Sequence, residues 1–134
     1  MIETVRSAGK ATFKSAIPKH AARDIPAAVE FYEQKLGFKR LFLHDGYAGV
    51  ARGAVEIHLW QCDDKYIADN TACRINVEGI EALYDELCFQ GVIHPNGALE
   101  TKPWGLREFT ILDLDGNGIT FSEPALHMRP GGRP

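Results

Sequence analysis

The same order of secondary-structure signals occurs twice along the chain, and this repeat constrains the fold more than any other feature. In the first copy, apolar residues recur at helical spacing from Ile25 until Gly37. In the second copy, the same spacing begins at Ile80 and stops at Gly91. A glycine after the last periodic residue is a typical helix stop, because glycine adopts the left-handed conformation at low cost. The sequence therefore predicts two matching amphipathic helices, one in each copy.

Short runs with strand-like alternation flank both helices. One run precedes each helix and three follow it, so the expected strands are 13–17, 38–43, 47–51, 55–60, 73–77, 92–93, 109–112 and 119–122. A sheet covered by a single helix keeps one open face, so two copies side by side should form a cupped mixed sheet. We therefore predict an α+β fold of two tandem βαβββ modules, about 12–61 and 72–122, in a single domain with loose termini at 1–11 and 124–134.

Charge and cysteine content limit the partners and the compartment. The chain has 15 basic and 18 acidic residues, and its net charge of −3 matches a nucleic-acid backbone poorly but permits a cationic ligand. No apolar run approaches the roughly 18 residues of a membrane helix, and the N-terminus has no apolar signal segment. Cys62, Cys73 and Cys88 contain no C-x-x-C pair and are expected to be free thiols in the core. We therefore expect a cytoplasmic protein without a nucleic-acid or membrane partner.

Glu56 and His58 are the best local candidates for metal binding, because their i, i+2 spacing on an expected strand puts both side chains on one face. A protein metal site usually has three or more protein ligands, and the matching strand of the second copy offers Thr120 and Ser122. The alternative is a polar strand surface that faces solvent or a ligand. The sequence also lacks G-x-S-x-G, H-E-x-x-H, G-x-x-x-x-G-K-[ST] and G-x-G-x-x-G. We therefore expect no metal, no cofactor and no catalytic residue.

Several aromatic residues lie in or beside expected strands and loops, away from the helical stripes. They are Phe42, Tyr47, Trp60, Tyr66 and Trp104. Trp104 lies between Pro103 and Gly105, in a segment without strand periodicity, where a role in the core is harder to arrange. An indole or phenol ring on a concave wall offers a large rigid surface for stacking flat heteroaromatic groups. The alternative is that these rings fill the interior of the cup.

Eight short segments together carry a family resemblance. They are SAIP at 15–18, ARDIPAAVEFY at 22–32, LGF at 36–38, YAGVAR at 47–52, DNT at 69–71, PWG at 103–105, REF at 107–109 and DGN at 115–117. On these segments the chain resembles the bleomycin resistance proteins of the vicinal oxygen chelate superfamily over residues 12–122. FY…LGF and DGN occur throughout that superfamily, whereas the combination of the strand-ending proline, YAGV, DNT and PWG is more specific.

The resemblance implies a homodimer in which the N-terminal strand crosses to the partner at Pro18. It also implies a non-catalytic protein that confers resistance by sequestering a bleomycin-type glycopeptide in two grooves between the subunits, where aromatic rings stack on its bithiazole. Tyr47 and Trp104 match the stacking positions, with Tyr47 in place of the more usual Phe, and Phe42 matches the groove wall. The ligand-binding residues predicted in this way are Phe42, Tyr47, Trp60, Tyr66, Asp69 and Trp104.

The chain departs from the family pattern at two positions beside the groove. Leu41 and His44 stand where the pattern carries acidic residues that would contact the cationic tail of the drug. Other acidic residues of the chain could compensate, namely Asp45, Asp63, Asp64 and Asp69.

The enzymes of the same superfamily are the alternative class. They hold a divalent metal with His and Glu ligands from matching strands, and would act here as a glyoxalase, lyase or dioxygenase on a small molecule. The aligned positions are Ile17, Ala72 and Thr120, with only Glu56 or His58 able to act at the fourth. Because divalent ions need several oxygen or imidazole donors, the sequence favours a binding protein over a metalloenzyme.

Overall fold

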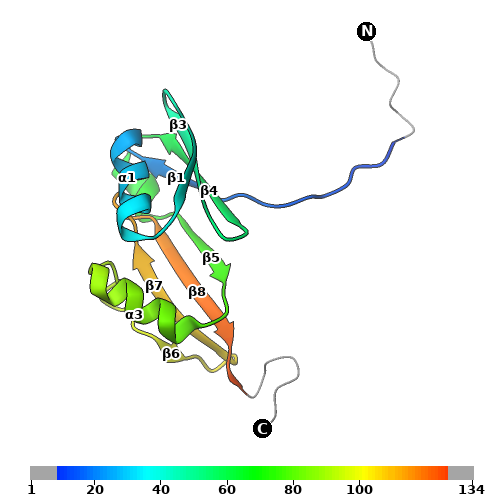
Figure 1. Ribbon diagram of the computed structural model, residues 1–134, viewed down its shortest axis with the longest axis vertical. Coiled ribbons are helices and arrows are strands. Elements are labelled where there is room, and N and C mark those ends of the chain that lie inside the picture. Colours follow the sequence, from blue (N-terminus) through cyan, green and yellow to red (C-terminus); the bar gives the residue numbers. More distant parts are fainter. Residues whose placement is uncertain (1–8, 127–134) are drawn as a thin grey trace.

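Each half of the chain forms a four-stranded sheet with a helix on one face in the computed structural model, which describes residues 9–126 (Figure 1). In chain order the elements are β1 (Lys19–Ala22), α1 (Ile25–Lys35), β2 (Lys39–His44), β3 (Tyr47–Arg52), β4 (Val55–Gln61), α2 (Lys65–Asp69), β5 (Ala72–Asn76), α3 (Ile80–Gln90), β6 (Glu100–Thr101), β7 (Leu106–Leu112) and β8 (Gly118–Pro124). Sheet A has the order β1-β4-β3-β2, and sheet B has the equivalent order β5-β8-β7-β6. The predicted repeat and the α+β class are therefore confirmed.

The two sheets also share their strand directions. In sheet A the outer strand β1 runs parallel to β4, and in sheet B the outer strand β5 runs parallel to β8. The other pairings in both sheets are antiparallel. Each module is thus one β-strand and one helix followed by a three-stranded antiparallel unit, and each sheet is mixed.

Local sequence explains where the two long helices begin and end. Asp24 caps α1, because its Oδ1 accepts a hydrogen bond from the backbone N–H of Ala27 at 3.0 Å, and proline occupies the first turn. Gly37 follows α1 with φ at 73°, and Gly91 ends α3 with the same φ. A side chain would strain both positions, so the two helix stops predicted from the sequence are confirmed.

The hydrophobic core lies on the helix side of both sheets. Strand alternation turns Val50, Ile57 and Leu59 of sheet A inward, and it turns Phe109 and Ile119 of sheet B inward. These residues belong to one buried cluster that includes members of both modules. The opposite face of each sheet carries no helix of its own (Figure 1), and these two faces are called the open faces below.

The turn between β7 and β8 is held by one carboxylate. Oδ1 of Asp113 accepts hydrogen bonds from the backbone N–H groups of residues 115, 116 and 117 at 3.0, 3.1 and 2.9 Å. The turn also reaches the other module, because Asp115 Oδ1 accepts a hydrogen bond from the backbone N–H of Arg23 at 3.0 Å. The turn between β7 and β8 is therefore also a contact between the two modules.

A buried polar network continues from this turn into the first module and comprises His20, Tyr32, Asp113 and Asn117. Tyr32 Oη donates to Asp113 Oδ2 at 2.6 Å, so Nδ1 of His20, 3.1 Å from the same hydroxyl, is the donor in that contact. Asn117 Nδ2 donates to the backbone carbonyl of Ala21 at 2.9 Å. Burial would raise the pKa of Asp113, but the hydrogen bonds from His20, Tyr32 and Asn117 outweigh it and leave the pKa below its ordinary value.

The expected strand at 13–17 is wrong for the single chain. Residues 9–18 form no strand, and β1 begins after Pro18, at Lys19. This segment points away from the sheets (Figure 1), and Phe13 is 97% exposed. A strand needs a neighbour for its backbone hydrogen bonds, and β1 reaches β4 only from Pro18 onward, where the Pro18 carbonyl accepts from the backbone N–H of His58 at 3.0 Å.

Four other features differ from the expectations. Residues 62–71, expected as a loop because they are rich in Asp and Asn, contain helix α2, which begins after the N-cap Asp64. Residues 92–93 form only an isolated bridge from Ile93 to Ile111, and the edge strand of sheet B is β6. The cysteines are not all core residues, because Cys88 is exposed and the other two are half-buried. The terminus expected to be loose from residue 124 still contributes the last residue of β8 and buries Ala125, while residues 1–8 and 127–134 lie outside the described part.

Within residues 9–126, no helix combines the length and the apolar character that crossing a membrane requires.

Candidate ligand-binding faces

The open face of sheet A gathers most of the aromatic residues singled out in the sequence. Because side chains alternate along a strand, Tyr47 on β3 and the pair His58 and Trp60 on β4 turn away from the core. Tyr47 lies opposite Trp60 in the β3–β4 register, and Gly49 lies opposite His58. Phe42 on β2 lies opposite Gly49. The structure therefore brings Phe42, Tyr47 and Trp60 onto one surface, as a set of neighbouring cross-strand side chains.

The rings of this face form an aromatic wall that depends on a glycine. Phe42 stacks on Tyr47 with ring centroids 6.1 Å apart and planes inclined by 20°, and it meets His58 edge-on at 5.2 Å. A Cβ at position 49 would overlap Cε2 of Phe42, so only glycine lets this ring lie over β3. The β2 register shifts between Arg40 and Phe42. This local irregularity is typical of a β-bulge that re-aims a side chain.

A chain of polar contacts runs along the same wall. The Tyr47 hydroxyl lies 2.7 Å from Nδ1 of His58, and Nε2 of His58 lies 2.6 Å from Oε2 of Glu56. The His58 ring also meets the Tyr47 ring edge-on at 5.3 Å. Glu56 and His58 therefore share one face, as their spacing predicted. They contact each other, and His58 also contacts Tyr47.

The open face of sheet B presents Trp104 from the turn between β6 and β7. The indole is 60% exposed, yet its Nε1 donates a hydrogen bond to Oε2 of Glu108 at 2.9 Å. Arg74 on β5 donates to the same oxygen at 2.7 Å, and Lys102 Nζ lies 6.0 Å from the centroid of the Trp104 ring. The ring is thus held by one polar contact while its surface stays accessible.

Glu108 is the residue that fixes Trp104, and its ionisation matters for that role. Burial would raise the pKa of Glu108, but the hydrogen bonds from Trp104 and Arg74 and the charge of Arg74 outweigh it. The pKa of Glu108 is therefore lowered, and the carboxylate remains a strong acceptor at neutral pH. Sequence reasoning missed Glu108 and Arg74, because only strand register brings them to Trp104.

Two predicted residues lie on neither open face. Tyr66 and Asp69 are in the short helix α2, where Tyr66 is 73% exposed. Oδ1 of Asp69 accepts a hydrogen bond from Nζ of Lys65 at 2.6 Å. Within one chain, Tyr47 and Trp104 belong to different sheets.

Acidic side chains gather at one end of sheet A. Asp45 is exposed in the turn between β2 and β3, two residues before Tyr47. The backbone N–H of Gln61 donates to the carbonyl of Gly46 at 3.0 Å, which brings the end of β4 beside this turn. Asp63 and the cap residue Asp64 follow directly, and both are exposed. This end of the aromatic wall can therefore attract a cationic group, although Leu41 and His44 carry no acid.

The donor set for a metal is sparse on both open faces. Among residues 9–126, no cluster of three or more His, Cys, Asp or Glu side chains could hold an ion. On sheet B, Thr120 lies opposite Arg74, and its hydroxyl is 2.8 Å from the hydroxyl of Thr110.

Burial, followed by the charge of Asp113, raises the pKa of Cys73 to about 11, so this thiol stays protonated at neutral pH. It is therefore a poor metal ligand and a poor nucleophile.

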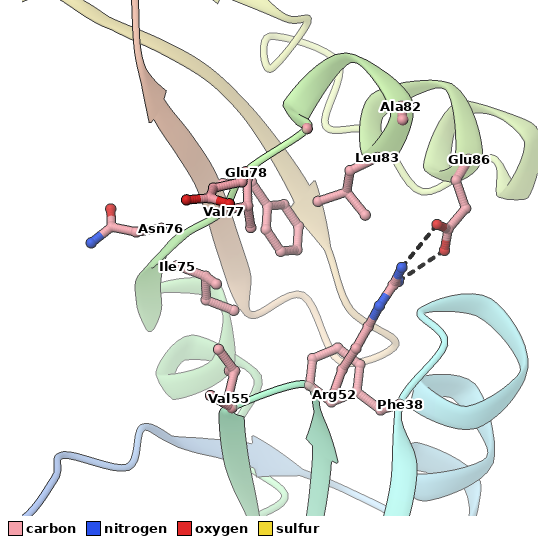
Figure 2. A pocket seen from close by; sticks show the side chains of 13 residues that line it. Phe38, Arg52, Val55, Ile75, Asn76, Val77, Glu78, Ala82, Leu83 and Glu86 are labelled. Carbon is pink, nitrogen blue, oxygen red and sulfur yellow. Dashed lines mark hydrogen bonds and ion pairs between the residues drawn. The ribbon is translucent and has the colours of Figure 1, made fainter. Parts of the chain in front are cut away.

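A cavity of about 520 Å³ lies between the modules and was not predicted (Figure 2). Its lining includes Phe38, Ile75, Leu83 and Phe121 but none of the predicted ligand-binding residues. Arg52 crosses from the first module to α3, where Nη1 and Nη2 donate to Oε2 and Oε1 of Glu86 at 2.8 and 2.9 Å (Figure 2). The cavity is therefore a gap at the seam between modules, bordered by an ion pair.

The chain is similar to known proteins along most of its length. The family model described as the glyoxalase/bleomycin resistance protein/dioxygenase superfamily matches residues 19–121. A bleomycin resistance protein of Geobacillus stearothermophilus is 35% identical to this chain, across 79% of this chain and 93% of that protein. A bleomycin resistance protein of Staphylococcus aureus strain N315 has the same identity and coverage.

Solved structures agree with the sequence matches. A bleomycin-binding protein from Streptomyces verticillus, crystallised with copper(II)-bleomycin, superposes with a TM-score of 0.73 at 32% identity, covering 84% of this chain and 97% of that chain. A bleomycin resistance determinant encoded on transposon Tn5 gives a TM-score of 0.74 at 22% identity, which supports the fold, and covers 84% of this chain and 98% of that chain. The chain therefore belongs to the glyoxalase/bleomycin resistance protein/dioxygenase superfamily and, within it, to the bleomycin resistance proteins.

Proposed function

We propose that this protein binds a bleomycin-type antibiotic without chemical change and confers resistance by sequestering it. The observation that carries the proposal is the pair of accessible aromatic surfaces, Tyr47 with Phe42 on sheet A and Trp104 on sheet B, each on an open face. Rigid aromatic surfaces suit the stacking of a flat heteroaromatic group. The relatives named bleomycin resistance proteins and the bleomycin-bound neighbour support this ligand.

The remaining predicted residues receive subsidiary roles in this proposal. Trp60 extends the aromatic wall beside Tyr47, while Tyr66 and Asp69 contribute from α2, outside the two open faces. The acidic end of sheet A, with Asp45 and Asp63, attracts the cationic tail of the drug. The cytoplasm as the place of action stays a prediction from the free thiols.

A direct titration tests the function. Purified metal-free protein is titrated with bleomycin while tryptophan fluorescence is followed, and we expect a saturating change near one drug per chain. A second titration with the isolated bithiazole fragment separates stacking from contacts of the tail. No saturable change, together with turnover that depends on added metal, would favour the alternative of a metal-dependent enzyme.

We infer further that the protein acts as a homodimer with exchanged N-terminal segments. The exposed Phe13 and the segment at 9–18 that leaves the body of the chain support exchange, since an apolar side chain in water gains free energy by burial against a partner. Two copies would also bring Tyr47 of one chain and Trp104 of the other to the two sides of one groove. In this arrangement each chain is a single domain.

The dimer is tested by sedimentation at micromolar concentration, where we expect the mass of two chains. A chain that lacks residues 1–17 should dissociate more readily, because it loses the exchanged segment that ends at Pro18. A chain that lacks residues 127–134, and so keeps the buried Ala125, is the matched control and should sediment like the parent. A parent protein that sediments as a monomer would contradict the assembly.

A protein that only binds its ligand needs no catalytic metal. We therefore expect that no divalent ion copurifies with it in stoichiometric amount. The positions aligned with the metal ligands of related enzymes hold Ile17, Ala72 and Thr120, none of which is a typical ligand. Elemental analysis of the purified protein measures this directly. One ion per chain that is lost in both Glu56→Ala and His58→Ala would overturn the prediction and reopen metal-assisted chemistry.

A further inference from the structure

Glu56 and His58 on β4 and Tyr47 on β3 form one chain of hydrogen bonds on the open face of sheet A. Tyr47 on β3 lies 2.7 Å from His58 Nδ1, and His58 Nε2 lies 2.6 Å from Glu56 Oε2 on the same strand β4. Both distances are within the range of strong hydrogen bonds. We refer to Glu56, His58 and Tyr47 as the wall relay. The stacking ring Tyr47 is its outer member, so the relay ends at the proposed binding surface.

The proton positions in the relay follow from the chemistry of its members. An ionised carboxylate can only accept, so the His58 nitrogen that contacts Glu56 must carry a hydrogen. In a neutral imidazole the other nitrogen, Nδ1, is then an acceptor, and Tyr47 must donate its only hydroxyl hydrogen to it. The remaining capacity of the Tyr47 oxygen is two lone pairs. The hydroxyl therefore presents an acceptor to whatever lies on the wall.

Protonation of His58 reverses this arrangement. A cationic imidazolium donates from both nitrogens, so Tyr47 would accept from Nδ1 and turn its own hydrogen outward. Other charged or titratable groups on this face include Lys19 on β1, whose Nζ lies 6.0 Å from the Tyr47 ring centroid, and His44 on β2, which packs beside Phe42. Lys39 on β2 shares the face as well, because it lies opposite Ala51 of β3, which lies opposite Glu56.

We propose that Glu56 and His58 hold the Tyr47 hydroxyl as a hydrogen-bond acceptor, so that the wall selects flat cationic ligands that carry an N–H donor beside the stacked ring. This inference rests on the proposed function and adds a specificity determinant to the same site. Glu56 and His58 are positioning residues, because they act through Tyr47. When His58 takes up a proton, the wall gains a positive charge and loses the acceptor, so binding of such a ligand weakens.

The pH dependence of bleomycin affinity tests the relay in the full-length protein. We expect affinity to fall from pH 8 to pH 5.5 by about threefold to tenfold more in the parent than in Tyr47→Phe, the effect of one hydrogen bond. Tyr47→Phe keeps the ring but has no hydroxyl to reverse. Because the same drug titrates in every experiment, the difference between the two profiles isolates the protein.

Two histidine variants separate the relay from general charge. His58→Gln provides an amide that can donate to Glu56 and accept from Tyr47 but cannot be protonated, so its profile should be at least as shallow as that of Tyr47→Phe. His44→Gln removes the neighbouring histidine outside the relay and should keep the slope of the parent. A purely structural role for His58 would lower affinity equally at every pH and would leave the slope unchanged.

Nitrogen-15 NMR of the imidazole rings gives a readout that does not need the drug. At pH 8 we expect His58 to carry its hydrogen on Nε2, and Tyr47→Phe should shift the Nδ1 resonance. A hydrogen on Nδ1 in the parent would overturn the relay. Saturable binding with identical pH profiles in parent and variants would overturn this inference and leave the proposed function standing, whereas no binding at any pH would overturn both.

Discussion

Replacing Trp104 by alanine is expected to weaken bleomycin binding about thirtyfold, the largest effect of any single substitution on affinity. Truncation of a tryptophan at the centre of an interface commonly costs about 2 kcal/mol or more, which corresponds to that factor. Trp104 is suited to this role because its ring is accessible while its Nε1 is bonded to Glu108 at 2.9 Å. Little side-chain entropy is then lost when a flat ligand stacks on it.

Isothermal titration calorimetry measures this loss without relying on tryptophan emission, which the substitution changes by removing one of the two tryptophans. Phe89→Ala is the matched control, because this ring is 90% exposed on α3, on the helix side of sheet B, and its loss should not change affinity. Added salt should weaken the contribution of the tail in both proteins, since charges at the surface are screened over about 8 Å at physiological ionic strength. Equal affinity in Trp104→Ala and the parent, with fold and dimer intact, would exclude stacking on this ring.

Replacing Asp113 by alanine is expected to lower the free energy of unfolding by about 3–5 kcal/mol, because several donors lose one shared acceptor and a buried donor left unpaired costs about 1–3 kcal/mol. The carboxylate accepts from three backbone N–H groups of its own turn and from Tyr32 and Asn117. Its removal leaves these donors buried without an acceptor. Because the buried polar network joins both modules, the loss should also reduce the cooperativity between them.

Urea unfolding followed by circular dichroism measures the change. Asp85→Ala removes an exposed carboxylate from α3 and should alter stability by less than about 0.5 kcal/mol. Tyr32→Phe deletes one hydroxyl of the network and should cost about 1–2 kcal/mol, between the two. If Asp113→Ala unfolded at the same urea concentration as Asp85→Ala, the network would not hold the modules together.

The pH dependence of stability has opposite signs at the two acids of this turn. The pKa of Asp113 is lowered in the folded state, so its contribution is present above the pKa of the unfolded chain and is lost as pH falls toward the folded value. Burial, with the nearby charge of Asp113, raises the pKa of Asp115. Ionisation of Asp115 therefore reduces stability as pH rises. Below neutral pH the two effects oppose each other, and Asp115→Asn should expose that of Asp113.

Signals that are local in the sequence predicted the fold well. The α1 cap at Asp24, the stops at Gly37 and Gly91 and the alternation around Tyr47 depend on residues within a few positions of one another, so their structures followed directly. Residues 13–17 alternate like a strand but have no neighbouring strand in the single chain. Alternation describes the segment alone, whereas a strand requires a partner.

The candidate site could be predicted only in part for the same reason. Spacing put Glu56 and His58 on one face, and the family resemblance put Tyr47 at a stacking position. The contact between Tyr47 and His58 depends on the β3–β4 register, and the contact of Trp104 with Glu108 and Arg74 depends on three strands of sheet B. Neither register has a signature in a single sequence, since a shift of one residue would exchange the two faces.

The glycine beneath Phe42 has a consequence for how this family could adapt to new drugs. The outline of the wall at this point is set by a missing side chain, because Phe42 occupies the space above Gly49. Any glycine codon becomes an alanine codon by one nucleotide change, and the added methyl group would force the Phe42 ring off β3. Selection could thus reshape the aromatic wall in a single mutational step, at a position that has no side chain of its own.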